Sequence, residues 1–384
     1  MMSALRNQKI RGIIFQLLTV IGLVAFLWYI GMNTMSNIEQ RGIKTGFDFL
    51  SGTAGFGIHE TPISFTESDT HGRVFLVGLS NTLIIAFIGI ILSTFLGLIV
   101  GVLRLSNNWL IKKLAAAYID IFRNIPILLQ ILFWYNVVLK ALPSPRQSLD
   151  FFGTIFLNNR GFIIPQPSFN STTIAVITGV LISIVAIFIL NKWANKRQED
   201  TGEDFPVFLT SLALIIVLPI LAFFLGGSNF GFDYPALKGF NFRGGKSISP
   251  EFLALTFALV IYTATFIAEA VRSGIEAVSK GQKEAAASIG LTSYQALKLV
   301  VLPQAIRIAI PPTINQYLNL IKNSSLATAI GYPEIVTVFA GTSLNQVGQA
   351  IEIIAITMLV YLTISLVVSA ILNWFNHKMK IKER

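Results

Sequence analysis

A series of apolar runs, each long enough to cross a lipid bilayer, constrains this chain more than any other feature. A helix needs about 20 mainly apolar residues to span the hydrocarbon core. Hydropathy predicts eight such runs, at residues 13–32, 76–103, 123–142, 172–191, 207–226, 251–271, 304–322 and 350–372. Because backbone polar groups must be satisfied inside each span, the sequence predicts an all-α, polytopic membrane protein with about eight transmembrane helices.

The composition agrees with this class and excludes others. Of the 384 residues, 53% are hydrophobic and 12% are charged, whereas a soluble domain carries about 25% charged residues. The absence of cysteine excludes disulfides and thiolate metal sites. The three histidines, His59, His71 and His377, are scattered. We therefore expect the chain to bind no metal or cofactor, and the net charge of +10 does not indicate a nucleic-acid partner in a membrane protein.

Lysine and arginine are unevenly distributed between alternate loops. The loops on the N-terminal side of the membrane carry more of them, and the positive-inside rule then places both termini in the cytoplasm. The first apolar run follows Arg6, Lys9 and Arg11, is long for a signal peptide and lacks a convincing cleavage site, so we interpret it as a retained anchor. We expect a multi-pass membrane protein.

The runs suggest four parts. Residues 33–73 should form an outside segment with little structure of its own, and a charged cytoplasmic turn should join the two spans at 172–226 into a hairpin. The predicted parts are an anchor and outside segment (1–75), a first core part (76–142), an inserted region with the hairpin (143–249) and a second core part (250–384).

One cytoplasmic segment, residues 281–307, does not look like a membrane span. Ala285, Ala286 and Ala287 favour a helix, and the negative charge of Glu284 suits a helix N-terminus. Gly290 can end that helix in the left-handed conformation. We expect Thr292 or Ser293 to cap a second helix, which Pro303 should end. Two short helices with a sharp bend could be an interfacial linker or an element that docks into a groove of another protein.

The spacing in this segment favours docking. Glu284-Ala285-Ala286, three residues, Gly290, nine residues, Val300, one residue and Leu302-Pro303 resemble the EAA loop of ABC-importer permeases, in which Ile stands at the position of Val300. The resemblance implies that Glu284, Ala285, Ala286, Gly290, Leu302 and Pro303 dock on an ATPase subunit.

The resemblance extends beyond the loop to the polar amino acid (His/Glu/Gln/Arg) group of these permeases. The similar stretches are GLSNTLIIAFIGIILSTFLGLIVGVLRLS (78–106), YIDIFRNIPILLQILFWY (118–135), TATFIAEAVRSGIEAVSKGQ (263–282) and PPTINQYLNLIKNSSLATAIGYPEI (311–335). The group commonly has a five-span core, and the added anchor and hairpin are similar to the first permease subunit of general L-amino acid importers.

This resemblance implies an ABC type I importer core that translocates L-amino acids from periplasm to cytoplasm by alternating access. It also implies a second permease in a heterodimer, a periplasmic amino acid binding protein and an ATPase dimer that holds ATP and Mg. The chain itself is then a transport subunit and not an enzyme. One stretch, GFNFRGGKS (239–247), invites comparison with a P-loop, but Phe240 stands where the first glycine is required. We interpret it as a loop turn.

Six polar residues are candidates for the translocation path or its gating. Glu269 and Arg272 lie one helical turn apart, so they can pair on one face, either to fix a helix end or to line the path. Lys322, Asn323 and Ser324 follow the seventh span, where the resembled family commonly reads Lys-Asp-Thr. Asn323 removes an acidic partner for Lys322, which could snorkel or line the pore.

Arg123 is the sixth candidate, at the expected cytoplasmic entry to the third span. Pro126 suits a helix start there, and an Asp120–Arg123 pair could also explain the charge. The alternative function is a stand-alone ion-coupled secondary transporter. Such proteins usually have paired repeats and buried acids near the midplane, whereas the sequence shows no convincing repeat, and Glu269 lies near the cytoplasmic end of its span.

Overall fold

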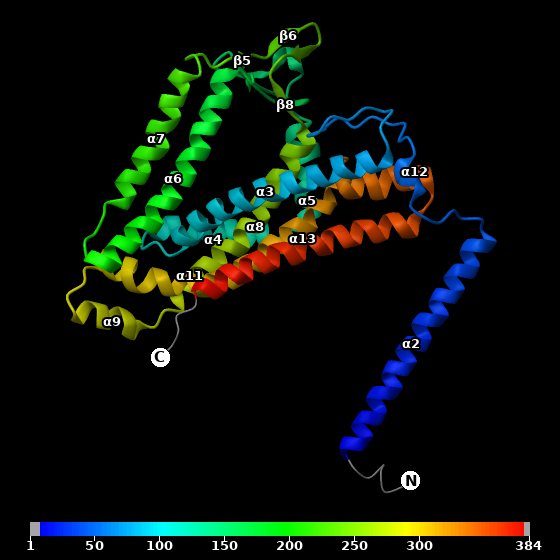
Figure 1. Cartoon of the computed structure of the whole chain (residues 1–384), viewed down its shortest axis with the longest axis horizontal. Helices are drawn as coiled ribbons and strands as arrows, with labels where there is room; N and C mark the ends of the chain where they lie inside the picture. The colour runs from blue at the N-terminus through cyan, green and yellow to red at the C-terminus, as the bar shows by residue number, and fades with distance from the viewer. Residues whose placement is uncertain (1–7, 380–384) are drawn as a thin grey trace. The chain divides into compact units, whose positions relative to one another are not determined.

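The computed structural model describes residues 8–379 and is mostly helical (Figure 1). Within that range seven helical segments are long and apolar enough to cross a membrane, or eight if a broken pair counts as one span. The spanning helices are α2 (Gln8–Gln40), α3 (His71–Arg104), α6 (Ser171–Thr201), α7 (Val207–Leu225), α8 (Pro250–Glu276), α11 (Leu302–Asn323) and α13 (Ala350–Met379). The predicted helical membrane fold is confirmed.

The third predicted span is the broken pair, and its predicted start at residue 123 was wrong. Helix α4 (Trp109–Asn124) ends there, and a short helix α5 (Ile127–Leu132) continues as the π-helix η2 (Phe133–Leu139). Pro126 has no amide hydrogen and forces the preceding Ile125 into an extended conformation (φ −92°, ψ 127°). Arg123 and Asn124 therefore lie in the last turn of α4, before the break.

The chain divides into two compact units. One unit comprises the residues up to Ile125 and from Leu259 onward, and the other comprises Pro126–Ala258. In the first unit, α3 and the later half of α8 approach closely at glycines. A Cβ on Gly97 would lie 2.6 Å from Cβ of Ile267, and one on Gly101 would lie 2.8 Å from Cβ of Val271. The Gly97–Gly101 spacing thus permits this helix contact.

The segment after α2 is more ordered than expected. Helix α2 runs on to Gln40, and a 3-10 helix η1 (Asp48–Ser51) precedes a β-bridge between Thr53 and Thr70. Phe49 is buried against Ile335, Phe339 and Ile353. The prediction of little structure for 33–73 was wrong because this Gly- and Thr-rich segment carries apolar side chains that fill the core of the first unit.

The second unit contains short strands that hydropathy did not predict. Strands β1 (Leu149–Phe151), β2 (Ile155–Asn158), β3 (Gly161–Ile164) and β8 (Lys246–Ile248) form an antiparallel sheet in the order β1-β2-β3-β8. Strand β4 (Gln166–Pro167) pairs with β5 (Phe232–Asp233), and β6 (Ala236–Lys238) pairs with β7 (Asn241–Arg243). The stretch 239–247 thus lies in a β-hairpin turn and strands. A P-loop would place a helix after Lys246, so the interpretation as a turn holds.

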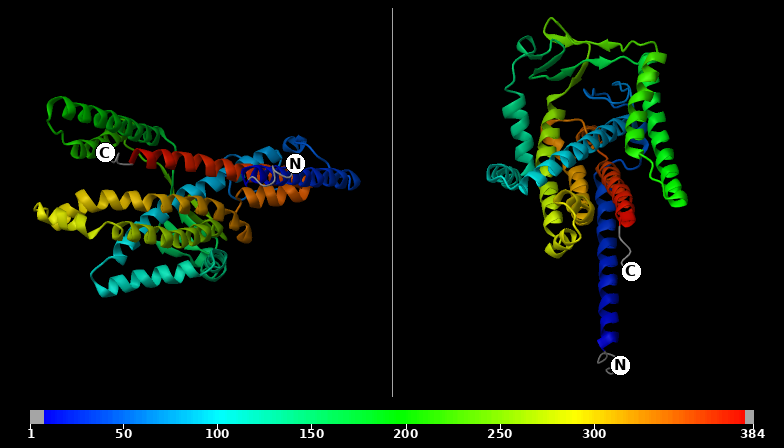
Figure 2. Two further views of the ribbon diagram at one scale, coloured as in Figure 1. Left: turned by 90° about the horizontal axis from the view of Figure 1, so that it is seen from below. Right: turned by 90° about the vertical axis from the view of Figure 1, so that its left-hand side faces the viewer.

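Helices α6 and α7 form the predicted two-span hairpin and run side by side in all views (Figures 1 and 2). Gly179 lets α6 approach α7, because a Cβ there would meet Ala222 at 2.8 Å. The ends of the hairpin are tied together, since the Thr172 hydroxyl donates to the carbonyl of Gly226 over 2.7 Å. At the opposite end Arg197 pairs with Glu203 at 2.7 Å, and Gly202 ends α6 with φ +72°.

Candidate docking loop and translocation path

The segment 281–307 forms two helices with a sharp bend, as the sequence predicted. Helix α9 (Lys280–Ser288) ends near Gly290, whose φ of +80° lies in the left-handed region that glycine adopts without strain. Thr292 caps the next helix, α10 (Ser293–Ala296). Its hydroxyl accepts from the backbone N–H of Gln295, and the Gln295 side chain accepts from the N–H of Thr292 at 2.9 Å, completing a capping box.

Pro303 does not end the second helix, and that prediction was wrong. Helix α10 passes through the π-helical turn η4 (Leu297–Val301) directly into α11, and the combined segment Ser293–Ile330 is long enough to span the membrane. Pro303 lies directly after this π turn, at the second residue of α11. The wider π turn before it relieves the clash of the ring with the preceding carbonyls. The loop and the span are therefore one mechanical element.

The loop is anchored by a small core under its polar surface. Val278, Val301 and Ala305 form a buried cluster, and Ala286 of α9 is 3% exposed. A Cβ on Gly274 of α8 would lie 2.6 Å from the carbonyl oxygen of Ala305, so α8 and α11 nearly touch at the base of the loop. These contacts hold the base of the loop against α8 and α11.

The other side of the bend exposes apolar side chains. Ile289, Tyr294 and Leu299 are 76%, 70% and 61% exposed, and Glu284, Ala285, Leu302 and Pro303 are exposed around them. Sequence reasoning missed Ile289, Tyr294 and Leu299, although their apolar character among polar neighbours was an available signal. An exposed apolar surface beside a rigid bend suits docking into a groove.

Glu269 and Arg272 pair, as predicted, near the end of α8 that leads to the loop. Nη2 of Arg272 lies 2.8 Å from Oε2 of Glu269, and the guanidinium also pairs with Glu276. The predicted Asp120–Arg123 ion pair does not form within residues 8–379. The Arg123 guanidinium instead stacks 5.3 Å from the ring centroid of Phe266.

A polar pocket of about 290 Å³ lies between α8 and α11. It is lined by Tyr262, Thr263, Phe266, Gln316, Asn319 and Asn323. Phe266 contributes to this pocket and also carries the Arg123 stack, so the structure brings Arg123 and Asn323 to the same region. Sequence reasoning missed Asn319 as a path candidate, although a polar residue inside a span was a signal.

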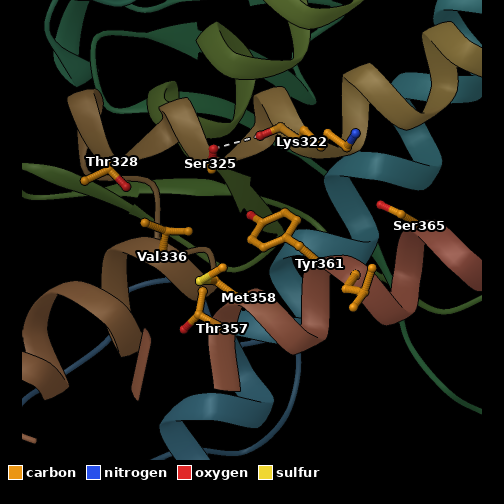
Figure 3. Close-up of a pocket in the computed structure, with 9 residues that line it drawn as sticks. Lys322, Ser325, Thr328, Val336, Thr357, Met358, Tyr361 and Ser365 are labelled. Carbon is orange, nitrogen blue, oxygen red and sulfur yellow. Dashed lines mark hydrogen bonds between the residues drawn. The ribbon is translucent and has the colours of Figure 1, made fainter. Parts of the chain in front are cut away.

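Lys322 and Ser324 are not part of that pocket. Lys322 borders a separate groove of about 590 Å³ (Figure 3). Ser325, Thr328, Val336, Thr357, Met358, Tyr361, Leu362 and Ser365 line the rest of it. Within residues 8–379 no carboxylate pairs with Lys322, which fits the replacement of the family's acid by Asn323. Ser324 is fully buried and donates to the carbonyl of Ile321 at 2.7 Å. The six path candidates therefore do not form one site.

Glu334 is a buried acid that sequence reasoning did not single out. It lies between η5 (Ser324–Ile330) and the π-helix η6 (Val336–Ser343), is fully buried, and accepts from the backbone N–H of Thr337 at 2.8 Å. The Tyr361 hydroxyl of α13 donates to its other oxygen at 3.0 Å. Burial raises the pKa of the Glu334 carboxyl, and the hydrogen bonds oppose that rise. Among the described residues no group of three His, Asp or Glu side chains could hold a metal ion.

The sequence of this chain is similar to those of known membrane transport proteins. Residues 204–381 match the family described as binding-protein-dependent transport system inner membrane component. The chain is 49% identical over 382 residues to the general L-amino acid transport system permease protein AapQ of Rhizobium johnstonii, covering 100% of this chain and 95% of that protein. It is 50% identical over 378 residues to the putative amino-acid ABC transporter permease protein YhdX of Escherichia coli, covering 98% and 96%.

This chain belongs to the amino-acid ABC transporter permeases. A third relative of the permease is the glutamate/glutamine/aspartate/asparagine transport system permease protein BztB of Rhodobacter capsulatus, 39% identical over 409 residues, covering 98% of this chain and 96% of that one. A solved structure, described as a crystal structure of an amino acid ABC transporter with histidines, shares 21% identity, covers 80% of this chain and 95% of its own, and has a TM-score of 0.48.

The resemblance drawn from the motifs is thus confirmed. The family match includes α8, the loop 281–307, α11 and all of α13. Members of this family are multi-pass transport subunits of a membrane complex and work with an ATP-hydrolysing partner and a substrate-binding protein. The permease is therefore a transport component and not an enzyme.

Proposed function

We propose that this permease subunit moves L-amino acids from the periplasm to the cytoplasm by ATP-driven alternating access. The observation that carries the proposal is the bent loop 281–307, which exposes Ile289, Tyr294 and Leu299 on one side and is packed onto α8 and α11 on the other. Closure of an ATPase dimer would move α9, and α11 would follow because η4 joins them without a break.

The free energy for the change in access comes from differential binding. The closed and open ATPase states would bind the two conformations of the permease with different affinities, and this difference shifts the population. Glu284, Ala285, Ala286, Gly290, Leu302 and Pro303 form the docking element in this proposal. Glu269 and Arg272, whose ion pair lies between the spans and the loop, would keep this end of α8 rigid during the movement.

The amino acid would pass beside the polar pocket between α8 and α11. Gln316, Asn319 and Asn323 supply amide groups there, which can donate and accept hydrogen bonds to an amino acid backbone. Arg123 would contribute positive charge near Phe266. Lys322 and Ser324 are assigned to the gating region between η5 and α13.

The proposed complex contains this chain in a heterodimer with a second permease, an ATPase dimer that binds ATP and Mg, and a periplasmic amino acid binding protein. We place both termini and the loop 281–307 in the cytoplasm of a bacterial inner membrane, on the charge distribution of the loops. The strands of the second unit then lie on the periplasmic side. The relationship to ABC transporter permeases favours this model over a stand-alone secondary transporter.

Coupling between ATP hydrolysis and uptake tests the role of the loop. Gly290→Pro cannot adopt φ +80°, because the proline ring holds φ near about −65°, so the bend should be lost. Glu284→Lys should weaken docking by reversing a charge on the exposed face. In proteoliposomes that contain the whole complex, we expect both variants to insert normally and to lose most of the uptake per ATP hydrolysed.

Gly202→Pro is a matched control. Gly202 also has positive φ, +72°, and a Cβ added there, as at Gly290, would have no other atom within 4 Å, but Gly202 lies in the α6–α7 turn. This variant should retain coupled transport. Normal coupling in both Gly290→Pro and Glu284→Lys would count against docking through this loop.

A further inference from the structure

The hairpin between β1 and β2 holds a phenylalanine in an unusual position. Phe152 has φ +62° and is 95% exposed, and Gly153 beside it has φ +68°. A turn with positive φ at both central positions favours Asn or Gly, and positive φ is an outlier for a bulky residue. Neither folding nor burial explains the aromatic ring at this tip. Strained backbone of this kind is typical of functional sites, which suggests that the Phe152 ring binds a partner.

A second hairpin tip carries another exposed phenylalanine. Phe240, in the turn between β6 and β7, is 73% exposed. The Arg146 guanidinium stacks 4.2 Å from its ring centroid, and Arg160 donates to its backbone carbonyl over 3.5 Å. Below them Phe242 stacks on Phe156 of β2, with 4.5 Å between the ring centroids. These contacts hold the second hairpin against the first, at the end of β2 opposite to Phe152. Strand β2 has only four residues, about 13 Å, so both exposed rings fit within one protein interface.

This surface is positively charged. In residues 143–170 and 226–249 there are five basic residues, Arg146, Arg160, Lys238, Arg243 and Lys246, and two acidic ones, Asp150 and Asp233. Both acids are used inside the fold, since Asp150 accepts from the N–H of Gly153 at 2.8 Å and Asp233 accepts from that of Gly245 at 3.0 Å. Within the described residues none of the five cations forms an ion pair. The surface therefore suits an acidic partner.

The partner should be soluble rather than lipid. The strands gather at one end of the α6–α7 hairpin, and none of them runs along the apolar lengths of these helices (Figure 1). Exposed aromatic rings together with arginine are typical of protein interfaces, where such residues supply most of the binding energy.

We propose that the two hairpin tips, with Phe152, Phe240, Arg146 and Arg160, dock the soluble substrate-binding protein through an acidic surface that borders an apolar hollow. The inference rests on the proposed function, because only an importer needs such a partner on this side. It adds a second docking element, which precedes α8 in the chain, to the loop 281–307, which follows α8.

Phe152→Gly tests this directly, because it removes the ring and relieves the positive φ at the same time. The fold should be unchanged or more stable. With the whole complex in nanodiscs and the purified cognate binding protein as the probe, we expect the Kd to rise about tenfold or more in Phe152→Gly and in Phe240→Ser. ATP hydrolysis without the binding protein should be unchanged.

Phe208→Ser is the matched control. Phe208 is 78% exposed, but it lies in the first turn of α7, at the end of the hairpin remote from the strands. The complex that carries Phe208→Ser should bind the binding protein with the same Kd as the wild type. The charge contribution is tested by Arg160→Glu, which should weaken binding and flatten its dependence on salt.

Two negative outcomes are distinguishable. A Kd within about twofold of the wild type in both phenylalanine variants, while the wild-type complex binds the protein, would overturn this inference alone, because an interface anchor costs more than that when removed. If the wild-type complex neither binds the protein nor is stimulated by it, the proposed function fails, and this inference fails with it.

Discussion

At the scale of single residues, Glu334 connects three elements that are distant in the sequence. Its carboxyl accepts from Thr337 of η6 and from Tyr361 of α13, and the Thr328 hydroxyl of η5 lies 3.5 Å away. The next residue, Ile335, is bonded to α3, because its backbone N–H donates to the Thr82 hydroxyl. One buried side chain therefore fixes how the last two spans meet.

We predict that Glu334→Leu lowers the free energy of unfolding by about 1–3 kcal/mol, because it keeps the volume but leaves buried donors without an acceptor. Glu334→Gln should lose less, since its amide oxygen can still accept from Thr337. Thermal unfolding of the purified protein in detergent would measure both changes.

A control for the loss of charge is Glu39→Gln, on the exposed surface of α2, which should leave stability unchanged. Equal stability of Glu334→Leu and the wild type would contradict the role assigned to this carboxyl. The sequence could not have located Glu334, because its partners lie 3, 6 and 27 residues away and meet only in the folded unit.

At the scale of elements, the contact between α3 and α8 depends on the absence of side chains. Gly97→Ala would place a methyl group 2.6 Å from Cβ of Ile267, an atom that cannot move without shifting α8. Overpacking of this kind typically costs about 1–3 kcal/mol. We therefore predict a lower unfolding temperature for Gly97→Ala.

The control for this prediction is Gly22→Ala in the exposed helix α2, where nothing lies within 4 Å of the added methyl group. Alanine has the higher helix propensity, so stability there should stay the same or rise. A Gly97→Ala protein as stable as the wild type would mean that the two helices do not meet at this glycine.

Elements also show what the sequence could and could not predict. Long apolar runs and the Glu284–Pro303 spacing identified the spans and the bent loop, because both depend on local pattern. The break at Pro126 was missed because α4 is amphipathic and lacks the hydropathy of a span. Pro303 was misread because a π turn, which the sequence does not reveal, accommodates it. The strands of the second unit have at most four residues, too few for a periodic signal.

At the scale of the whole molecule, the two proposed docking surfaces flank α8 in the sequence. The loop 281–307 is built into α8 and α11, and the hairpin tips precede α8 in the chain. A permease arranged in this way can bind an ATPase on one side and a substrate-loaded protein on the other. Its transport should then require both partners and the free energy of ATP hydrolysis.

Uptake of radiolabelled L-amino acids into proteoliposomes tests this account most directly. The account predicts uptake only when this chain is reconstituted with its second permease, its ATPase, its binding protein and ATP, and no uptake by this chain alone under an imposed proton or sodium gradient. Gradient-driven uptake by this chain alone, indifferent to ATP and to the partner subunits, would contradict it.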